Sequence, residues 1–185
     1  MSTASEAQVL SKTLVHAIPI RIPLLVGLTT TSHFLFGNIA SATLGLPTWF
    51  IDHPAELSAH QKVSGWSYFY KRGKAQYATS ALISALSFGL IAYRTPKGLD
   101  IRNYAIVACS LASSIGLFTF TAMGSTNARL TELYNNQALV SAVPGGLEEA
   151  EAEGLLQKWK DLNAVRMTFA AGAWLAAVGA MVSVY

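Results

Sequence analysis

The stretch "IPLLVGLTTTSHFLFGNIASATLGL", Ile22–Leu46, contains no charged residue and is followed by Pro47. About 20 residues of helix cross the hydrocarbon core of a bilayer, so this stretch is long enough to span a membrane. Lipid offers no hydrogen-bond partner to unpaired backbone N–H and C=O groups. A spanning segment of this kind is therefore expected to be helical, because a helix pairs these groups internally. The stretch therefore predicts a transmembrane helix over about 22–46.

Three further apolar segments predict helices over about 77–93, 104–124 and 167–185. Tyrosines stand at the ends of these segments, as is typical of side chains at a membrane–water interface. Only 12% of the chain is charged and 52% is hydrophobic, whereas soluble domains carry about 25% charged residues. The predicted fold is all-α: residues 1–185 form a single domain, an integral membrane four-helix bundle.

The links between these helices differ in length. Residues 94–103, "RTPKGLDIRN", form a short turn, whereas the links over 47–76 and 125–166 are long. With four crossings, both long links lie on one side of the membrane, opposite the termini. Small residues recur in "SALISALSFG" (80–89) and "ACSLASSIG" (108–116), which predicts close helix packing and also allows a homo-oligomer.

Several function classes are excluded by what the sequence lacks. The net charge of +3 and the absence of a basic run with interleaved aromatics argue against a nucleic-acid partner. The single cysteine, Cys109, cannot form an internal disulfide, and we expect it to pack as a small apolar side chain. No dinucleotide fingerprint is present, and the histidines lack the spacing of a metal motif.

His33 lies near the middle of the first predicted span. A titratable group at that depth is costly, so it usually faces the interior of the bundle and has a function. His33 is therefore a candidate ligand or proton acceptor. The structural alternative is a histidine that is hydrogen-bonded to a hydroxyl or carbonyl group of a neighbouring helix.

Two links contain further candidates for a binding site. "WSYFYKRGKAQY" (66–77) holds Trp66 and Tyr70 beside several cations, which suits either an interfacial anchor or the wall of a site for a planar phenolic guest. "GSTNARLTELYNNQ" (124–137) holds Asn127 and Arg129. Arg129 could bind a substrate or could simply pair with the glutamate three residues later.

The stretch "WKDLNAVR" (159–166) precedes the last apolar segment. At about 100° per residue, Trp159, Asn163 and Arg166 fall on one helical face, while Asp161 points elsewhere. The planar guanidinium of an arginine can hold an anionic oxygen through two donors, and Asn163 adds a neutral donor. The stretch therefore predicts one wall of a binding site at the membrane–water interface, where the last predicted span begins.

Four short motifs occur in order along the chain and together resemble the anthrone oxygenase family of small four-helix membrane proteins. They are a Gly-Asn pair near the end of the first helix, Y-x-x-G before the second, N-x-x-L after the third and W-x-x-x-N-x-x-R before the fourth. Their residues are Gly37, Asn38, Tyr70, Gly73, Asn127, Leu130, Trp159, Asn163 and Arg166.

The resemblance implies a membrane-bound monooxygenase of aromatic polyketide biosynthesis, a branch of secondary metabolism. Such an enzyme oxidises an anthrone to an anthraquinone with O2, with a planar polyketide and the lipid bilayer as its partners. It needs no apparent cofactor beyond O2, and we expect an intracellular membrane such as the endoplasmic reticulum.

The resemblance suggests a hypothetical role for each candidate residue. Arg166 and Asn163, with Asn127 as a further candidate, would stabilise an oxyanion, and His33 is the leading base, with Asp161 or His60 as substitutes. An alternative is a heme or metal with His33 as its axial ligand. The expected substrate contacts come from the aromatic residues and from two polar side chains: Trp159, Trp66, Tyr70, Asn127 and Arg129.

The competing hypothesis is a non-enzymatic four-helix membrane scaffold or accessory protein. It predicts that Trp159, Asn163 and Arg166 contact other protein groups and line no site.

Overall fold

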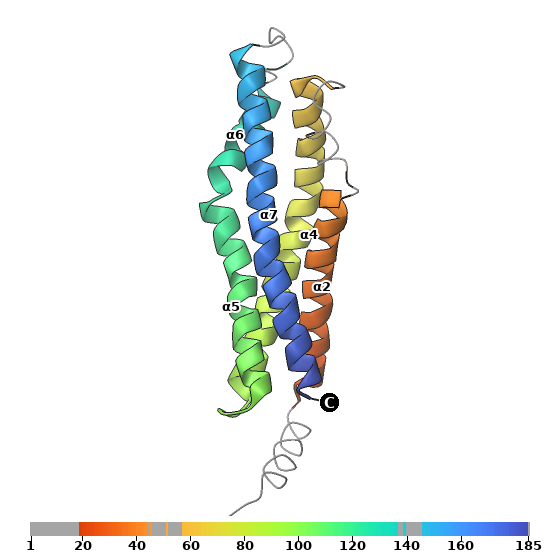
Figure 1. Cartoon of the computed structure of the whole chain (residues 1–185), viewed down its shortest axis with the longest axis vertical. Helices are drawn as coiled ribbons and strands as arrows, with labels where there is room; N and C mark the ends of the chain where they lie inside the picture. The colour runs from red at the N-terminus through yellow and green to blue at the C-terminus, as the bar shows by residue number, and fades with distance from the viewer. Residues whose placement is uncertain are drawn as a thin grey trace, which may run out of the picture. The chain divides into compact units, whose positions relative to one another are not determined.

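The chain is helical over the residues that the computed structural model describes, which are 19–43, 45, 51, 57–136, 139 and 146–184. In chain order, the helices are α2 (Arg21–Thr43), α4 (Ala59–Arg94), α5 (Asp100–Thr121), α6 (Gly124–Asn135) and α7 (Leu147–Val182) (Figure 1). Helices α2, α4, α5 and α7 are long and apolar enough to cross a membrane. This confirms the predicted all-α, four-span membrane bundle.

The helices extend beyond the predicted spans. Helix α4 begins at Ala59 and α7 at Leu147, so much of each predicted long link is helical. Helix α6 occupies another part of the second link. The predicted helix end at Pro47 lies outside the described residues, as does Tyr185.

The chain divides into two compact units. Unit 1 takes in Met1–Leu35, Thr79–Ile115 and Phe169–Tyr185, and unit 2 takes in Phe36–Ala78 and Gly116–Thr168. Each of the four long helices contributes residues to both units. Both long links belong to unit 2, and the short turn between α4 and α5 belongs to unit 1.

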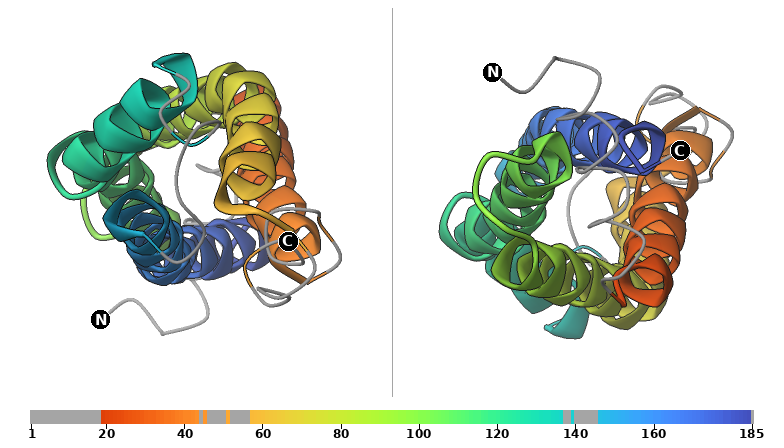
Figure 2. Two further views of the ribbon diagram at one scale, coloured as in Figure 1. Left: turned by 90° about the horizontal axis from the view of Figure 1, so that it is seen from above. Right: turned by 90° about the horizontal axis from the view of Figure 1, so that it is seen from below.

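Unit 1 is packed through small residues, as the sequence predicts. Ala105 and Ala108 of α5 and Ala177 and Ala180 of α7 are completely buried, which lets the helices approach closely. Figure 2 (right) shows the α2, α4, α5 and α7 segments of this unit end-on. Cys109 packs against this core, which confirms its expected role as a small apolar side chain.

Unit 2 has a separate core built by α4, α6 and α7. Trp66 of α4, Leu130 of α6 and both Ala152 and Trp159 of α7 are among its buried residues. Figure 2 (left) shows the ends of these helices from above. This core places Trp66 and Trp159, which are far apart in sequence, in one cluster.

Candidate functional site

Arg166 of α7 is oriented by two side-chain amides within unit 2. Its Nη2 donates to Asn163 Oδ1 at 2.5 Å and to Asn38 Oδ1 at 3.0 Å. Arginine can only donate hydrogen bonds, so both amides turn their oxygens towards it. Since these oxygens carry no net charge, the two contacts fix the guanidinium without cancelling its positive charge.

Tyr77 of α4 lies beside the same group, where two glycines make room for its ring. A Cβ atom on Gly37 would come within 3.0 Å of Tyr77 Cε1, and one on Gly73 within 3.2 Å of Tyr77 Cε2. The Tyr77 hydroxyl lies 3.4 Å from Ser41 Oγ. The phenols of Tyr77 and Tyr70 are both within electrostatic range of the Arg166 guanidinium.

An aromatic cluster adjoins these polar groups. The rings of Trp66 and Tyr70 stack with centroids 4.8 Å apart and an interplanar angle of 10°. Trp159 meets Trp66 edge-on, at 6.4 Å and 85°. The ammonium of Lys74 lies 5.7 Å from the centroid of the Tyr70 ring, which is within the range of a cation–π interaction. Tyr70 therefore contacts both the Trp66 ring and the Lys74 cation.

Unit 2 also contains buried polar atoms whose hydrogen-bonding capacity is unused. Among the described residues, Trp66 Nε1, Thr126 Oγ1 and Asn127 Oδ1 have no hydrogen-bond partner. The three side chains are 1%, 1% and 6% exposed, respectively. Buried polar groups are normally paired, and leaving one unpaired costs about 1–3 kcal/mol. Such atoms are suited to contacts with a bound guest.

All of the predicted substrate contacts belong to unit 2. Trp159, Asn163 and Arg166 lie on one face of α7, as expected, and Trp66 and Tyr70 lie close to them. Asn163 differs from the expectation in one respect: its oxygen accepts from Arg166, so in this contact the amide positions the arginine and does not donate.

Two of the predicted site residues lie in surface contacts instead. Arg129 is 42% exposed and pairs with Glu132 at 2.9 Å and with Glu151 at 2.7 Å. Donation of hydrogen bonds to Glu151, and secondly to Glu132, raises the pKa of the Arg129 guanidinium above its ordinary value. Asp161 is exposed and accepts from Gln157 Nε2 at 2.9 Å. The ion pair was the structural alternative for Arg129.

His33 belongs to unit 1, where its Nδ1 lies 2.9 Å from Ser80 Oγ of α4. This is the hydroxyl contact across helices that was the structural alternative. The side chain is exposed, contrary to the expectation that it faces the interior. His60 is half-buried at the start of α4. Within the described part of the chain, no group of three or more His, Cys, Asp or Glu side chains could hold a metal ion.

Two residues of the site were not predicted as such. Asn38 is 3% exposed and accepts a hydrogen bond from Arg166, although in the sequence it stood out only as part of the Gly-Asn pair. Tyr77 was interpreted as an interfacial tyrosine. The sequence features that could have indicated these two residues are the Gly-Asn pair at 37–38 and the glycine at 73. Each glycine leaves space for the Tyr77 ring, and Asn38 follows Gly37 directly.

The arrangement combines a charged donor, neutral orienting groups, phenols and stacked aromatic rings. A guanidinium that is fixed before a substrate arrives can stabilise a developing oxyanion with little reorganisation. Aromatic faces suit a planar, apolar body. The arrangement therefore suits the stabilisation of negative charge on an oxygen atom beside aromatic side chains.

Comparison with known proteins identifies the family of the chain. A model of the family described as anthrone oxygenase matches residues 66–176, which is more than half of the 185-residue chain. No curated protein and no solved structure matches the chain. The matched segment contains the aromatic cluster and the Arg166 face: Trp66, Tyr70, Asn127, Trp159, Asn163 and Arg166. The chain belongs to the anthrone oxygenase family.

Proposed function

We propose that this protein is a membrane-bound monooxygenase that uses O2 to convert an anthrone-type aromatic polyketide to an anthraquinone. The observation that carries the proposal is the Arg166 guanidinium, which two neutral amide oxygens orient beside aromatic side chains. This cluster lies largely within the segment that matches the anthrone oxygenase family. We further propose an intracellular membrane, such as the endoplasmic reticulum, as its location.

The proposed reaction begins with loss of a proton from the methylene carbon of the anthrone, which gives an aromatic enolate with its charge on oxygen. The enolate passes one electron to O2, and the two radicals combine to form a C–O bond. Protonation gives a hydroperoxide. Loss of water, with the remaining hydrogen of that carbon, leaves the second carbonyl of the quinone. One oxygen atom enters the product and the other leaves as water.

Arg166 is assigned the role of oxyanion stabiliser in this sequence. Its charge would favour the enolate over the neutral anthrone, which lowers the barrier to proton loss. Asn38 and Asn163 act as positioning residues, because they hold the guanidinium while leaving its charge intact. Removing one donor to an oxyanion typically costs about 100- to 1000-fold in kcat.

The aromatic cluster and the unpaired buried atoms support a guest over a purely structural role. A scaffold would equally explain the contacts of Arg166 with Asn163 and of Trp159 with Trp66. Trp66 Nε1 and Asn127 Oδ1 are buried and have no partner within the described residues. A substrate that carries hydroxyl and carbonyl groups could pair with both atoms.

His33 remains the proposed base, and its contact with Ser80 Oγ would set which ring nitrogen carries the proton. Because His33 belongs to unit 1, its action on a substrate at Arg166 is a separate hypothesis from the oxyanion role. His33→Gln is expected to lower kcat about 100-fold or more, as loss of a general base does. A wild-type kcat in this variant would contradict His33 as the general base and leave His60 or Asp161 as the candidates for that role.

We propose that O2 is the only co-reactant and that no cofactor is needed, since an electron-rich enolate can itself reduce O2. The alternative is a heme or metal ligated by His33. An absorption spectrum of the purified protein distinguishes the cofactor-free mechanism from the heme-dependent one. A heme band that disappears in His33→Gln would overturn the cofactor-free mechanism.

The proposed function is tested with purified protein in nanodiscs, incubated with 1,8-dihydroxyanthrone under 18O2. We expect the quinone to form faster than in protein-free nanodiscs and to carry one 18O atom. Equal rates with and without protein would contradict the proposal and favour the non-enzymatic scaffold.

A further inference from the structure

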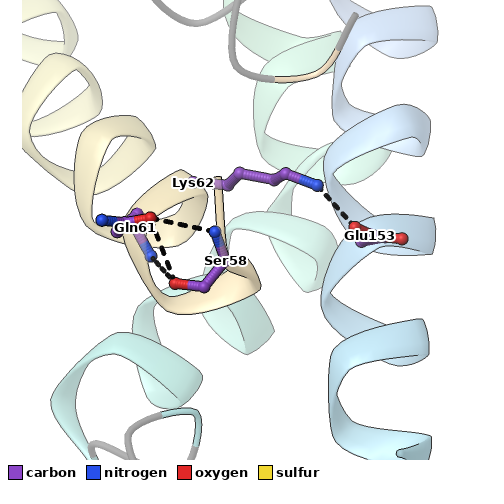
Figure 3. Close-up of polar contacts among 4 residues, drawn as sticks. All are labelled: Ser58, Gln61, Lys62 and Glu153. Carbon is purple, nitrogen blue, oxygen red and sulfur yellow. Dashed lines mark hydrogen bonds and ion pairs between the residues drawn. The ribbon is translucent and has the colours of Figure 1, made fainter. Parts of the chain in front are cut away.

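A pocket lies in unit 2 between the beginnings of α4 and α7. Figure 3 shows two of the residues that line it, Lys62 and Glu153. Its volume is about 180 Å³, and it is lined by Ile51, Lys62, Glu153, Leu156 and Gln157. On α7, Glu153 precedes Arg166 by 13 residues, a rise of about 20 Å in a helix. The pocket is therefore distinct from the proposed oxygenation site and does not depend on it.

Lys62 is the feature that makes this pocket chemically specific. Its side chain is only 2% exposed, and its Nζ lies 2.5 Å from Oε1 of Glu153, which is 50% exposed. A lysine ammonium has three N–H donors, and within the described residues Glu153 is the acceptor for one of them. Burying a charged group is costly unless its hydrogen bonds are satisfied, so the remaining donors call for acceptors in the pocket.

The charges of the pair decide which kind of acceptor fits. Glu153 already supplies one negative charge to the ammonium, and a second anion would be repelled by it at short range. A neutral hydroxyl group meets both partners, because its oxygen accepts from Lys62 while its hydrogen is donated to Glu153.

The volume of the pocket and its two aliphatic side chains define the rest of the ligand. Ile51 and Leu156 line the pocket beside the ion pair. An enclosed apolar cavity of about 150 Å³ is large enough for benzene, so a pocket of about 180 Å³ has room for a single ring. We propose that it is a binding site for a small, neutral, single-ring phenol, which lies against Ile51 and Leu156 with its hydroxyl group between Lys62 and Glu153.

The test uses 19F NMR titrations of the full-length protein in nanodiscs with three probes. They are 4-fluorophenol, 4-fluorotoluene, which lacks the hydroxyl group, and 4-fluorobenzoate, which is an anion. We expect saturable binding of 4-fluorophenol only. Lys62→Met should weaken that binding roughly tenfold or more, since a hydrogen bond to a charged group is lost. Arg72→Ala, on the exposed side of α4, serves as the matched control and should bind like wild type.

A gain of binding keeps the test informative if Lys62→Met fails to fold. Glu153→Gln removes the repelling charge and keeps an acceptor for Lys62, so this variant should bind 4-fluorobenzoate saturably whereas wild type does not. Absence of saturable 4-fluorophenol binding, or binding that Lys62→Met leaves unchanged, would overturn the proposal. Loss of 4-fluorophenol binding in Arg166→Ala with retention in Lys62→Met would also overturn it, by placing the phenol at the other site.

Discussion

Arg166 has the residue-scale property on which the proposed chemistry depends: a charge that is oriented by neutral partners. Asn163 is three residues away on the same helix, whereas Asn38 comes from α2 and is 128 residues away in sequence. The helical spacing of "WKDLNAVR" therefore predicts the face that holds Trp159, Asn163 and Arg166. It cannot predict Asn38, because that contact arises only when α2 packs beside α7.

The neutrality of Asn38 leads to a direct prediction. Asn38→Ala removes one orienting hydrogen bond and should lower kcat for quinone formation about tenfold, the effect of losing a hydrogen bond to a charged group. Asn38→Asp keeps an acceptor but pairs a negative charge with Arg166, and we expect a larger loss of kcat. Steady-state kinetics measure both variants. If Asn38→Asp retained the wild-type kcat, the charge of Arg166 would not be what the reaction uses.

Helix ends are where sequence and structure differ most at the scale of elements. Hydropathy marks the parts of α4 and α7 that suit lipid, but both helices continue as polar segments that carry Trp66, Tyr70 and Trp159. The beginning of α4 has a local signal of its own, a capping box. Ser58 N–H donates to Gln61 Oε1 at 2.9 Å, and Gln61 N–H donates to Ser58 Oγ at 3.3 Å (Figure 3). Such S-x-x-Q pairs mark helix starts, and this one could have extended the predicted helix.

Packing between α2 and α4 around Tyr77 gives a prediction at this scale. A Cβ on Gly37 would meet Tyr77 Cε1 at 3.0 Å and the Tyr77 hydroxyl oxygen at 3.1 Å, so the ring has to shift by a few tenths of an ångström to admit a methyl group. Gly37→Ala should therefore destabilise the fold by about 1–3 kcal/mol, as overpacking does.

Gly116→Ala is the matched control, since nothing lies within 4 Å of the added Cβ. It should be neutral or slightly stabilising, because alanine has the higher helix propensity. Thermal unfolding in nanodiscs compares the two variants. A Gly37→Ala protein as stable as Gly116→Ala would contradict the packing account.

Membrane topology is the property of the whole molecule that the sequence predicts most fully. Charge-free windows locate all four candidate spans, and an even number of crossings places both long links on one side. Exposed apolar residues on the spans, such as Leu86, Leu117 and Leu175, suit contact with lipid. The existence of two units could not be predicted, because it depends on which buried side chains cluster.

The topology is tested by labelling cysteines in sealed vesicles with a membrane-impermeant maleimide. In a Cys109→Ser background, new cysteines replace Gln61, Glu148 and Lys97, one at a time; all three positions are exposed. We expect the cysteines at positions 61 and 148 to react from the same side and the one at position 97 to react from the opposite side. Labelling of position 97 from the same side as position 61 would contradict four crossings.

The most direct test of the central claim is the rate of quinone formation by Arg166→Ala and Arg166→Lys, compared with Arg72→Ala, in nanodiscs. All three variants are first matched for helical content and elution volume. Arg166→Ala should lose about 100-fold or more in kcat. Arg166→Lys should recover only part of it, because a lysine cannot present two donors in one plane. Arg72→Ala should match wild type. Wild-type kcat in a folded Arg166→Ala protein would contradict the proposed role of this arginine.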